Sequence, residues 1–186
     1  HCLPIARLLF VGRLVEKKGL DLLLAALRRL PLKQRLGLDV IGEGPLLVPL
    51  QQLADQWQLD VRFLGFRDQH WLQRHGHQYH ALVAPFRVAA NGDRDTGPLV
   101  CKEAMALGLP VISSNIMGLP EIVNDECGRL IAPEDSQALA QAILWLQQRS
   151  TDQRHRMAIK GRQRVERFFC HHQQAAQLSA LIERLA

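Results

Sequence analysis

The amino-acid sequence predicts an α/β fold, a Rossmann-like doubly wound parallel sheet flanked by helices. Short apolar runs alternate with longer amphipathic stretches along the chain, which is typical of parallel βαβ units. The short runs are apolar along their whole length, as strands are when helices cover both faces of their sheet. No repeat, low-complexity tract or linker interrupts this alternation.

The first half of the chain predicts four strands and three helices. Strands are expected in the apolar runs 7–12, 38–44, 61–66 and 81–86, the second of which ends in a turn. Helices are expected between them, over 20–30, 45–57 and 68–75.

The second half predicts two more strands, at 110–114 and 128–133, and a group of helices. The helices are expected at 99–108, 135–149, 152–168 and 172–185. The stretch 147–169 is basic and amphipathic, with a solvated outer face. Contact of that face with anionic lipid is the alternative. The core stripe under it is expected at Met157, Ile159, Val165 and Phe168.

Length and composition indicate one domain over residues 1–186, since a chain of 186 residues with 47% hydrophobic residues can bury one good core. The sequence begins at His1 and shows neither a signal peptide nor a membrane-length apolar run, so we expect a piece of a longer soluble protein. Four scattered cysteines favour buried thiols in a reducing compartment. The net charge of +5 suits an anionic partner, whether phosphate metabolite, nucleic acid or acidic lipid.

Doubly wound sheets bind ligands beyond the carboxyl ends of their strands, so the loops there are the first place to look. After the first strand, Gly12 permits a tight turn, and Arg13 and Lys18 place two cations before the next helix. Cations together with backbone N–H groups suit a diphosphate. A solvated basic loop explains the same residues.

The loops after the second and third strands carry weaker signals. Gly42 and Gly44 let a ligand approach the backbone, but the third glycine of the dinucleotide fingerprint is missing. A nucleotide base could lie against the main chain near Phe66 and Arg67. Packing of Phe66 is the alternative.

The stretch "GDRDTGPLVCKEAMALGLPVISS" (92–114) is the most informative. A helix that begins near Leu99 would point its free N–H groups toward Asp95 and form an anion site. Glu103 lies about one turn into that helix, so its carboxylate can lean toward the same cleft. The two acids could then hold different hydroxyls of a sugar nucleotide. A helix cap at Asp95 and a surface acid at Glu103 would explain them equally well.

Taken in order, these segments resemble the C-terminal, nucleotide-sugar-binding domain of GT-B-fold retaining glycosyltransferases, the glycosyltransferases group 1 family (family 4). The resemblance covers nearly the whole chain, and its most specific part is "EAMALGLPVISS" followed by "GLPEIV". The stretch "ANGDRDTGP" looks most like members that build bacterial cell-surface polysaccharides.

The resemblance implies roles for the basic loop and the glycines. Arg13 and Lys18 would neutralise the donor diphosphate and stabilise the charge that grows on it as the glycosidic bond breaks. Gly12 would turn the chain beside them. Gly42 would let the nucleotide lie against the second loop, with its base near Phe66 and Arg67.

The resemblance also assigns the two acids. Glu103 matches the second acid of the family's E-x(7)-E motif, which holds the ribose hydroxyls. Asp95 stands at the first acid position, where the family usually has Glu against the transferred sugar. Asp is one methylene shorter, which costs roughly 1.5 Å of reach, and Thr96 stands where Gly is usual. The phosphate-facing turn would be formed by Gly97, Pro98 and Leu99.

Members of this family move a sugar from a nucleotide-diphosphate donor to an acceptor with retention, and they need no bound metal or other cofactor. The resemblance therefore implies a hexosyltransferase with a UDP- or GDP-linked donor, in cell-surface polysaccharide or glycolipid biosynthesis. The resemblance also implies an N-terminal domain that binds the acceptor glycan or lipid-linked sugar; we expect this domain to lie outside the chain and the isolated chain to be inactive. We expect a cytoplasmic protein, with peripheral contact at the inner face of the cytoplasmic membrane as a further expectation.

Other functions fit parts of the sequence. A related GT-B sugar-nucleotide epimerase would share the diphosphate site, and so would a non-catalytic nucleotide-binding domain. Nucleic-acid binding has only the charge in its favour, because no recognised motif supports it, and we expect none. The histidine-rich stretch 70–80 predicts no metal site, since its spacing does not make ligands converge and no Cys or carboxylate pair completes a shell.

Overall fold

The computed structural model describes residues 7–96 and 98–169. Within them, six strands form one sheet in the order β3-β2-β1-β4-β5-β6, and every neighbouring pair is parallel. This is the strand order of doubly wound nucleotide-binding sheets, so the predicted fold class is confirmed. The strands are β1 (Arg7–Val11), β2 (Gly37–Ile41), β3 (Val61–Gly65), β4 (Leu82–Ala84), β5 (Val111–Ser114) and β6 (Gly128–Ile131).

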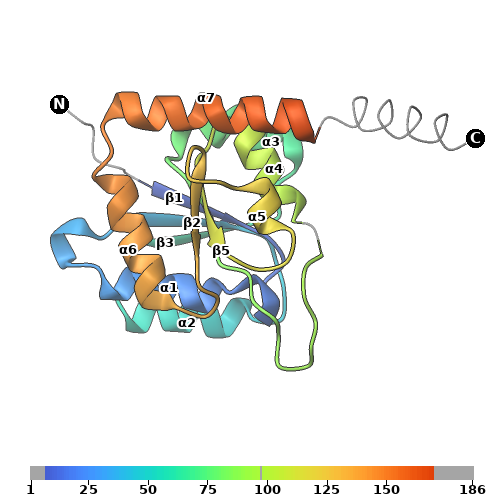
Figure 1. The fold of residues 1–186 in the computed structure, drawn as a ribbon. Helices are drawn as coiled ribbons and strands as arrows, with labels where there is room; N and C mark the ends of the chain where they lie inside the picture. Colours follow the sequence, from blue (N-terminus) through green and yellow to red (C-terminus); the bar gives the residue numbers. More distant parts are fainter. Residues whose placement is uncertain (1–6, 97, 170–186) are drawn as a thin grey trace, which may run out of the picture.

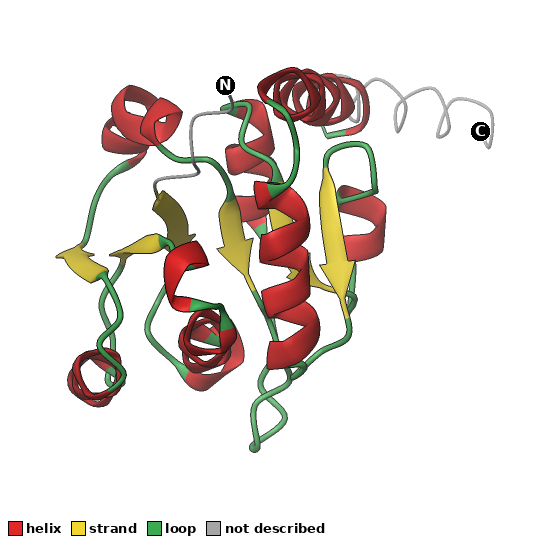
Figure 2. Cartoon of the chain, turned by 90° about the vertical axis from the view of Figure 1, so that its left-hand side faces the viewer, coloured by secondary structure: helices red, strands yellow, loops and turns green. Residues whose placement is uncertain are grey.

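Helices cover both faces of the sheet (Figures 1 and 2). One face carries α1 (Leu20–Arg29), α2 (Leu47–Gln56) and α6 (Ser136–Gln147). The other carries α3 (Gln69–His75), α4 (Leu99–Ala106) and α5 (Leu119–Ile122). The long helix α7 (Thr151–Phe168) packs against α4. Short 3₁₀ turns stand at η1 (Glu16–Lys18), η2 (Leu32–Gln34) and η3 (Gly76–Gln78).

The core divides into two clusters because successive side chains of a strand point to opposite faces. In β1, Leu8 and Phe10 belong to the cluster under α1, α2 and α6, whereas Leu9 belongs to the cluster under α3 and α4. All three side chains are at most 1% exposed. Burial of such a side chain contributes about 1.5–3 kcal/mol to folding, so both faces of this strand stabilise the sheet.

The predicted strands and helices are confirmed with small shifts at their ends. β4 ends at Ala84 because Pro85 has no N–H to donate to a neighbouring strand. The single-turn helix α5 was not predicted. The helix expected at 172–185 lies outside the described residues. Cys101 and Cys127 are free and buried, as predicted.

The predicted core stripe of α7 is wrong in part. Met157 is buried, but Ile159 is 42% and Phe168 is 49% exposed. Ile159 follows Met157 by two residues, about 200° around the helix, so the two cannot share one face. Gly161 lies on the buried face instead, where a Cβ would stand 3.4 Å from the Cβ of Cys127. None of the described helices combines the length and the apolar character that crossing a membrane requires.

Candidate functional site

The order of the strands places a switch point between β1 and β4. The chain leaves β1 toward β2 on one side, and β4 leads to β5 on the other. The loops that follow these two strands therefore diverge and leave a crevice outside the carboxyl ends of the sheet. Arg13 and Lys18 lie in the loop after β1, and Asp95 lies in the long loop after β4.

Two glycines let the loops at this edge meet backbone to backbone. Gly42, after β2, has φ +133°, and a Cβ on it would lie 2.0 Å from the carbonyl oxygen of Gly12. Gly19, at the start of α1, has φ +68°, and a Cβ there would lie 2.0 Å from the carbonyl oxygen of Pro85. The close contact with Gly12 already explains why position 42 requires glycine. The approach of a nucleotide to the Gly42 backbone stays a prediction.

Lys18 and Asp95 form the ion pair at the centre of the site. The Lys18 Nζ lies 3.1 Å from Asp95 Oδ1, and the side chains are only 16% and 20% exposed. The ammonium group also lies 5.0 Å from the centre of the Phe86 ring, at the distance of a cation–π contact. The residues of this pair are 77 positions apart, and the switch point brings them together.

An ion pair and hydrogen bonds connect the rest of the loop after β4 to the 3₁₀ turn η1. Lys17 Nζ lies 3.0 Å from Asp93 Oδ1, and the backbone N–H of Ala90 donates to Glu16 Oε1 at 3.1 Å. The Arg87 guanidinium donates to the Glu16 carbonyl oxygen at 3.0 Å. These contacts fix the segment that carries Asp95, and the sequence analysis missed them. No local pattern marks them, because they join segments more than 70 residues apart.

Helix α4 begins four residues after Asp95, as the sequence predicts. Glu103 lies one turn into it, half-buried, and lines a cavity of about 10 Å³ together with Val11 at the carboxyl end of β1. Pro98 is buried and Leu99 is 61% exposed. Gly97 lies outside the described residues.

Arg13, Phe66 and Arg67 lie at the same edge of the sheet and are exposed. Phe66 is 71% exposed, so the alternative that it packs into the core is wrong. Arg67 donates to the Phe66 carbonyl oxygen at 2.8 Å and lies 5.9 Å from the Trp71 ring centre. The exposed Phe66 ring offers a face on which a flat ring can stack.

Two buried polar atoms at this edge have no hydrogen-bond partner among the described residues. One is Asp95 Oδ2, and the other is the hydroxyl oxygen of Ser114, the last residue of β5. A buried polar atom left unsatisfied costs about 1–3 kcal/mol. The carboxyl edge is therefore suited to a ligand rich in hydroxyl groups.

Covalent catalysis by Cys101 does not fit the structure. The residue is fully buried in α4, and burial raises the pKa of its thiol to about 12. The side chain therefore stays a protonated thiol and packs as a small apolar group. Among the described residues there is also no group of three or more His, Cys, Asp or Glu side chains that could hold a metal ion.

Comparison with known proteins identifies the family. The sequence model of the family described as "Glycosyl transferases group 1" matches residues 6–164. The amylovoran biosynthesis glycosyltransferase AmsK of Erwinia amylovora is 37% identical over 186 residues, which cover 97% of this chain and 45% of AmsK. The chain belongs to the glycosyl transferases group 1 family, and it spans about half the length of the curated relatives it matches.

Solved structures show the same architecture. The sucrose-phosphate synthase of Thermosynechococcus elongatus superposes with a TM-score of 0.82 at 29% identity, over 98% of this chain and 46% of that one. Anabaena HepE, solved in complex with UDP and glucose, superposes with a TM-score of 0.76 at 25% identity, over 93% of this chain and 48% of that one. The sheet and its helices are thus one half of a GT-B fold.

Proposed function

We propose that this chain is the donor-binding domain of a retaining glycosyltransferase, which moves a hexose from a nucleoside-diphosphate sugar to an acceptor in cell-surface polysaccharide or glycolipid biosynthesis. The observation that carries the proposal is the meeting of Lys18, Asp95 and the start of α4 at the switch point of the sheet. Family membership and the likeness to AmsK, an amylovoran biosynthesis glycosyltransferase, support the reaction class.

The cations would bind and stabilise the leaving diphosphate. Negative charge grows on the diphosphate as the bond to the sugar breaks, and cations held in place lower that barrier. The Lys18 ammonium group, beside Asp95 and Phe86, already lies at the switch point where the diphosphate would bind and replace Asp95 as its partner. Arg13 and the first N–H groups of α4 would complete the diphosphate site.

The two acids would hold the hydroxyls of the donor. Asp95 uses Oδ1 for Lys18, and its buried Oδ2 is available to accept from a sugar hydroxyl. Because Asp95 shares its charge with Lys18, a donor diphosphate competes with this carboxylate for the same ammonium. Glu103, one turn into α4, would accept from the ribose hydroxyls.

The base would lie near Phe66 and Arg67, and the Gly42 backbone would face the nucleotide. HepE, which shares the fold, was solved with UDP and glucose, and this favours a UDP-linked donor over a GDP-linked one. The acceptor would bind a second domain outside this chain, because the relatives are about twice as long. We further propose that the enzyme acts in the cytoplasm, at the inner face of the membrane if its acceptor is lipid-linked.

Calorimetric titration of the chain with UDP, GDP and ADP tests the proposal. We expect UDP or GDP to bind in the micromolar-to-millimolar range and Arg13→Ala or Glu103→Ala to weaken that binding. If none of the three nucleotides gave a binding signal, the assignment as a donor-binding domain would be refuted.

A further inference from the structure

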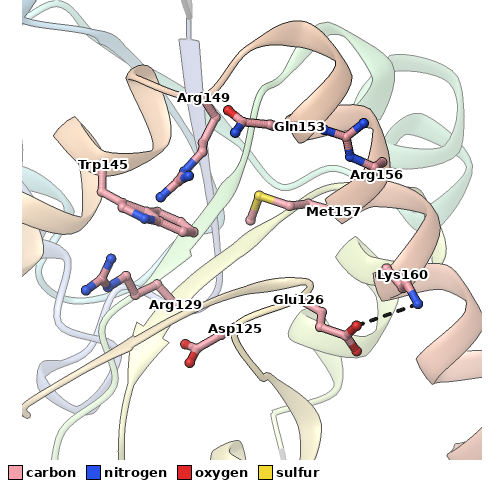
Figure 3. Close-up of a pocket in the computed structure, with 9 residues that line it drawn as sticks. All are labelled: Asp125, Glu126, Arg129, Trp145, Arg149, Gln153, Arg156, Met157 and Lys160. Atoms are coloured by element: carbon pink, nitrogen blue, oxygen red, sulfur yellow. Dashed lines mark ion pairs between the residues drawn. The ribbon is translucent and has the colours of Figure 1, made fainter.

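A second cavity lies at the opposite edge of the sheet from Lys18 and Asp95. It has a volume of about 610 Å³, within the range of small-molecule sites. Its walls come from the segment before β6, the amino end of β6, the end of α6 and the first half of α7 (Figure 3). The lining residues are Asp125, Glu126, Arg129, Trp145, Arg149, Gln153, Arg156, Met157 and Lys160.

Guanidinium groups stacked on an indole ring dominate one wall. Arg129 and Arg149 lie 4.9 and 4.6 Å from the Trp145 ring centre, and Figure 3 shows the ring between them. Stacking uses the face of a guanidinium and leaves its N–H groups to donate in the plane. Arg129, which lies over the Trp145 ring, can therefore still donate its N–H groups to a carboxylate or phosphate. Arg156 of α7 adds a further exposed cation to the rim.

The remaining walls suit the other surfaces of a sugar. Met157 gives a buried apolar floor. Asp125 lines the cavity as an acceptor for hydroxyl groups. Gln153 Oε1 already accepts from the Ser150 N–H at 2.9 Å, so this side chain offers its amide N–H groups as donors. Lys160 Nζ lies 3.6 Å from Glu126 Oε1, so the charges of these two residues compensate each other. The net positive charge of the cavity therefore comes from its arginines.

The cavity continues along the outer strand of the sheet. A neighbouring cavity of about 410 Å³ shares Arg129 and Trp145 with it and runs beside β6 to Ala132. β6 is the last strand of the sheet, so this side has no further strand among the described residues. The two cavities adjoin at Arg129 and Trp145, and together they offer space beyond the 610 Å³ of the first; we call them the β6 groove.

We propose that the β6 groove binds an acidic sugar, one that carries a carboxylate or a phosphate, and that it holds a short chain of such sugars better than a single one. The anion would lie against Arg129 and Arg156, the apolar face of the ring against Met157, and the hydroxyls against Asp125 and Gln153. The proposal does not depend on the donor site, because no residue of the β6 groove belongs to it.

The test is a calorimetric titration of the full chain with trigalacturonate, galacturonic acid, glucose 6-phosphate and neutral maltotriose. We expect trigalacturonate to bind more tightly than galacturonic acid and glucose 6-phosphate, and maltotriose not to bind. Arg129→Ala and Arg156→Ala should each weaken trigalacturonate binding by at least about tenfold. Arg162→Ala is the matched control, since Arg162 lies on α7 and pairs with Glu166 at 3.6 Å, outside the groove.

Each other outcome would overturn the proposal. If maltotriose bound as tightly as trigalacturonate, the groove would not recognise charge. Inorganic phosphate is titrated as well, and if it bound as tightly as glucose 6-phosphate, the groove would not recognise the sugar. Binding that Arg156→Ala leaves unchanged would place the ligand elsewhere. Random duplex DNA that binds more tightly than trigalacturonate, through the same arginines, would make the groove a nucleic-acid surface. Lys18→Ala should leave trigalacturonate binding unchanged, so this result is separate from the fate of the donor site.

Discussion

Two aspartates in this sheet are paired with cations in different ways. Asp39, in β2, is 1% exposed and accepts from Arg7 at 2.6 Å, from Arg62 at 2.7 Å and from the Tyr79 hydroxyl at 2.7 Å. Asp95 accepts from Lys18 alone, and its second oxygen is buried without a partner among the described residues.

The difference separates a structural carboxylate from one suited to a ligand. Both oxygens of Asp39 accept from groups of the protein, Arg7 in β1, Arg62 in β3 and Tyr79 before β4, so no acceptor is left for a ligand. Asp95 has one buried oxygen without a hydrogen-bond partner among the described residues, beside a cation that an anionic ligand can also use. A partly satisfied ion pair at the switch point of a doubly wound sheet is therefore the better guide to the binding site.

The largest expected effect is on stability. Asp39→Ala removes the shared acceptor and leaves Arg7 half-buried without this partner, so we expect a loss of about 3–5 kcal/mol in the free energy of unfolding. Urea denaturation measures it. Asp60→Ala is the control, because Asp60 also pairs with Arg7 but is 65% exposed, and we expect less than about 1 kcal/mol there. Equal losses would remove the distinction between the two kinds of carboxylate.

The same aspartate predicts a pH dependence. Burial raises the pKa of Asp39, but hydrogen bonds from Arg62, Tyr79 and Arg7 outweigh it and hold the pKa below the ordinary value of 3.8. The folded state then binds this proton less readily than the unfolded state, so the stabilisation is present above pH 3.8 and is lost as the pH falls through the lowered pKa. Unfolding free energies of the wild type and Asp39→Asn should differ by a constant amount at neutral pH and converge below about pH 4. A gap that persists in strong acid contradicts this.

Next in size is the effect of Lys18 on donor binding. Lys18→Ala should weaken UDP binding by about 10- to 100-fold, because a charge-assisted contact to the diphosphate is lost. Lys17→Ala is matched to it: the residue lies in the same 3₁₀ turn and pairs with Asp93 instead, so UDP affinity should change by less than about threefold. Calorimetric titration of both variants with UDP measures the difference. If both substitutions weakened UDP binding equally, only the overall charge of the loop would matter.

The smallest effect is expected at Asp95. Asp95→Asn removes the anion that competes with the diphosphate for Lys18, so free UDP should bind as well as to the wild type or several-fold more tightly. The transferred sugar is absent from UDP, so nothing that Asp95 would hold is lost. A tenfold weakening of UDP binding would show that Asp95 positions Lys18 and does not compete for it.

The elements of the fold could be predicted from the sequence because apolar periodicity reports burial, and burial decides strands and helices here. The same logic fails at Ile159, because apolar character alone does not say which face of a helix a residue occupies. Ile159 lies about 200° around α7 from the buried Met157. Positions in the segments that follow the carboxyl ends of strands, such as Arg13 after β1 and Glu103 in the helix after β4, could be predicted from the rule for parallel sheets. The Lys18–Asp95 pair and the stack of Arg129 and Arg149 on Trp145 could not, because each joins segments that only the folded chain brings together.

The most direct test of the central claim is an NMR titration of the isotope-labelled chain with UDP, following backbone amides. The account predicts that the shifted signals gather in the loops after β1, β2, β3 and β4 and in the first turn of α4, and that Lys18→Ala diminishes them together. Shifts confined to the β6 groove, or no shifts with UDP or GDP, would contradict it.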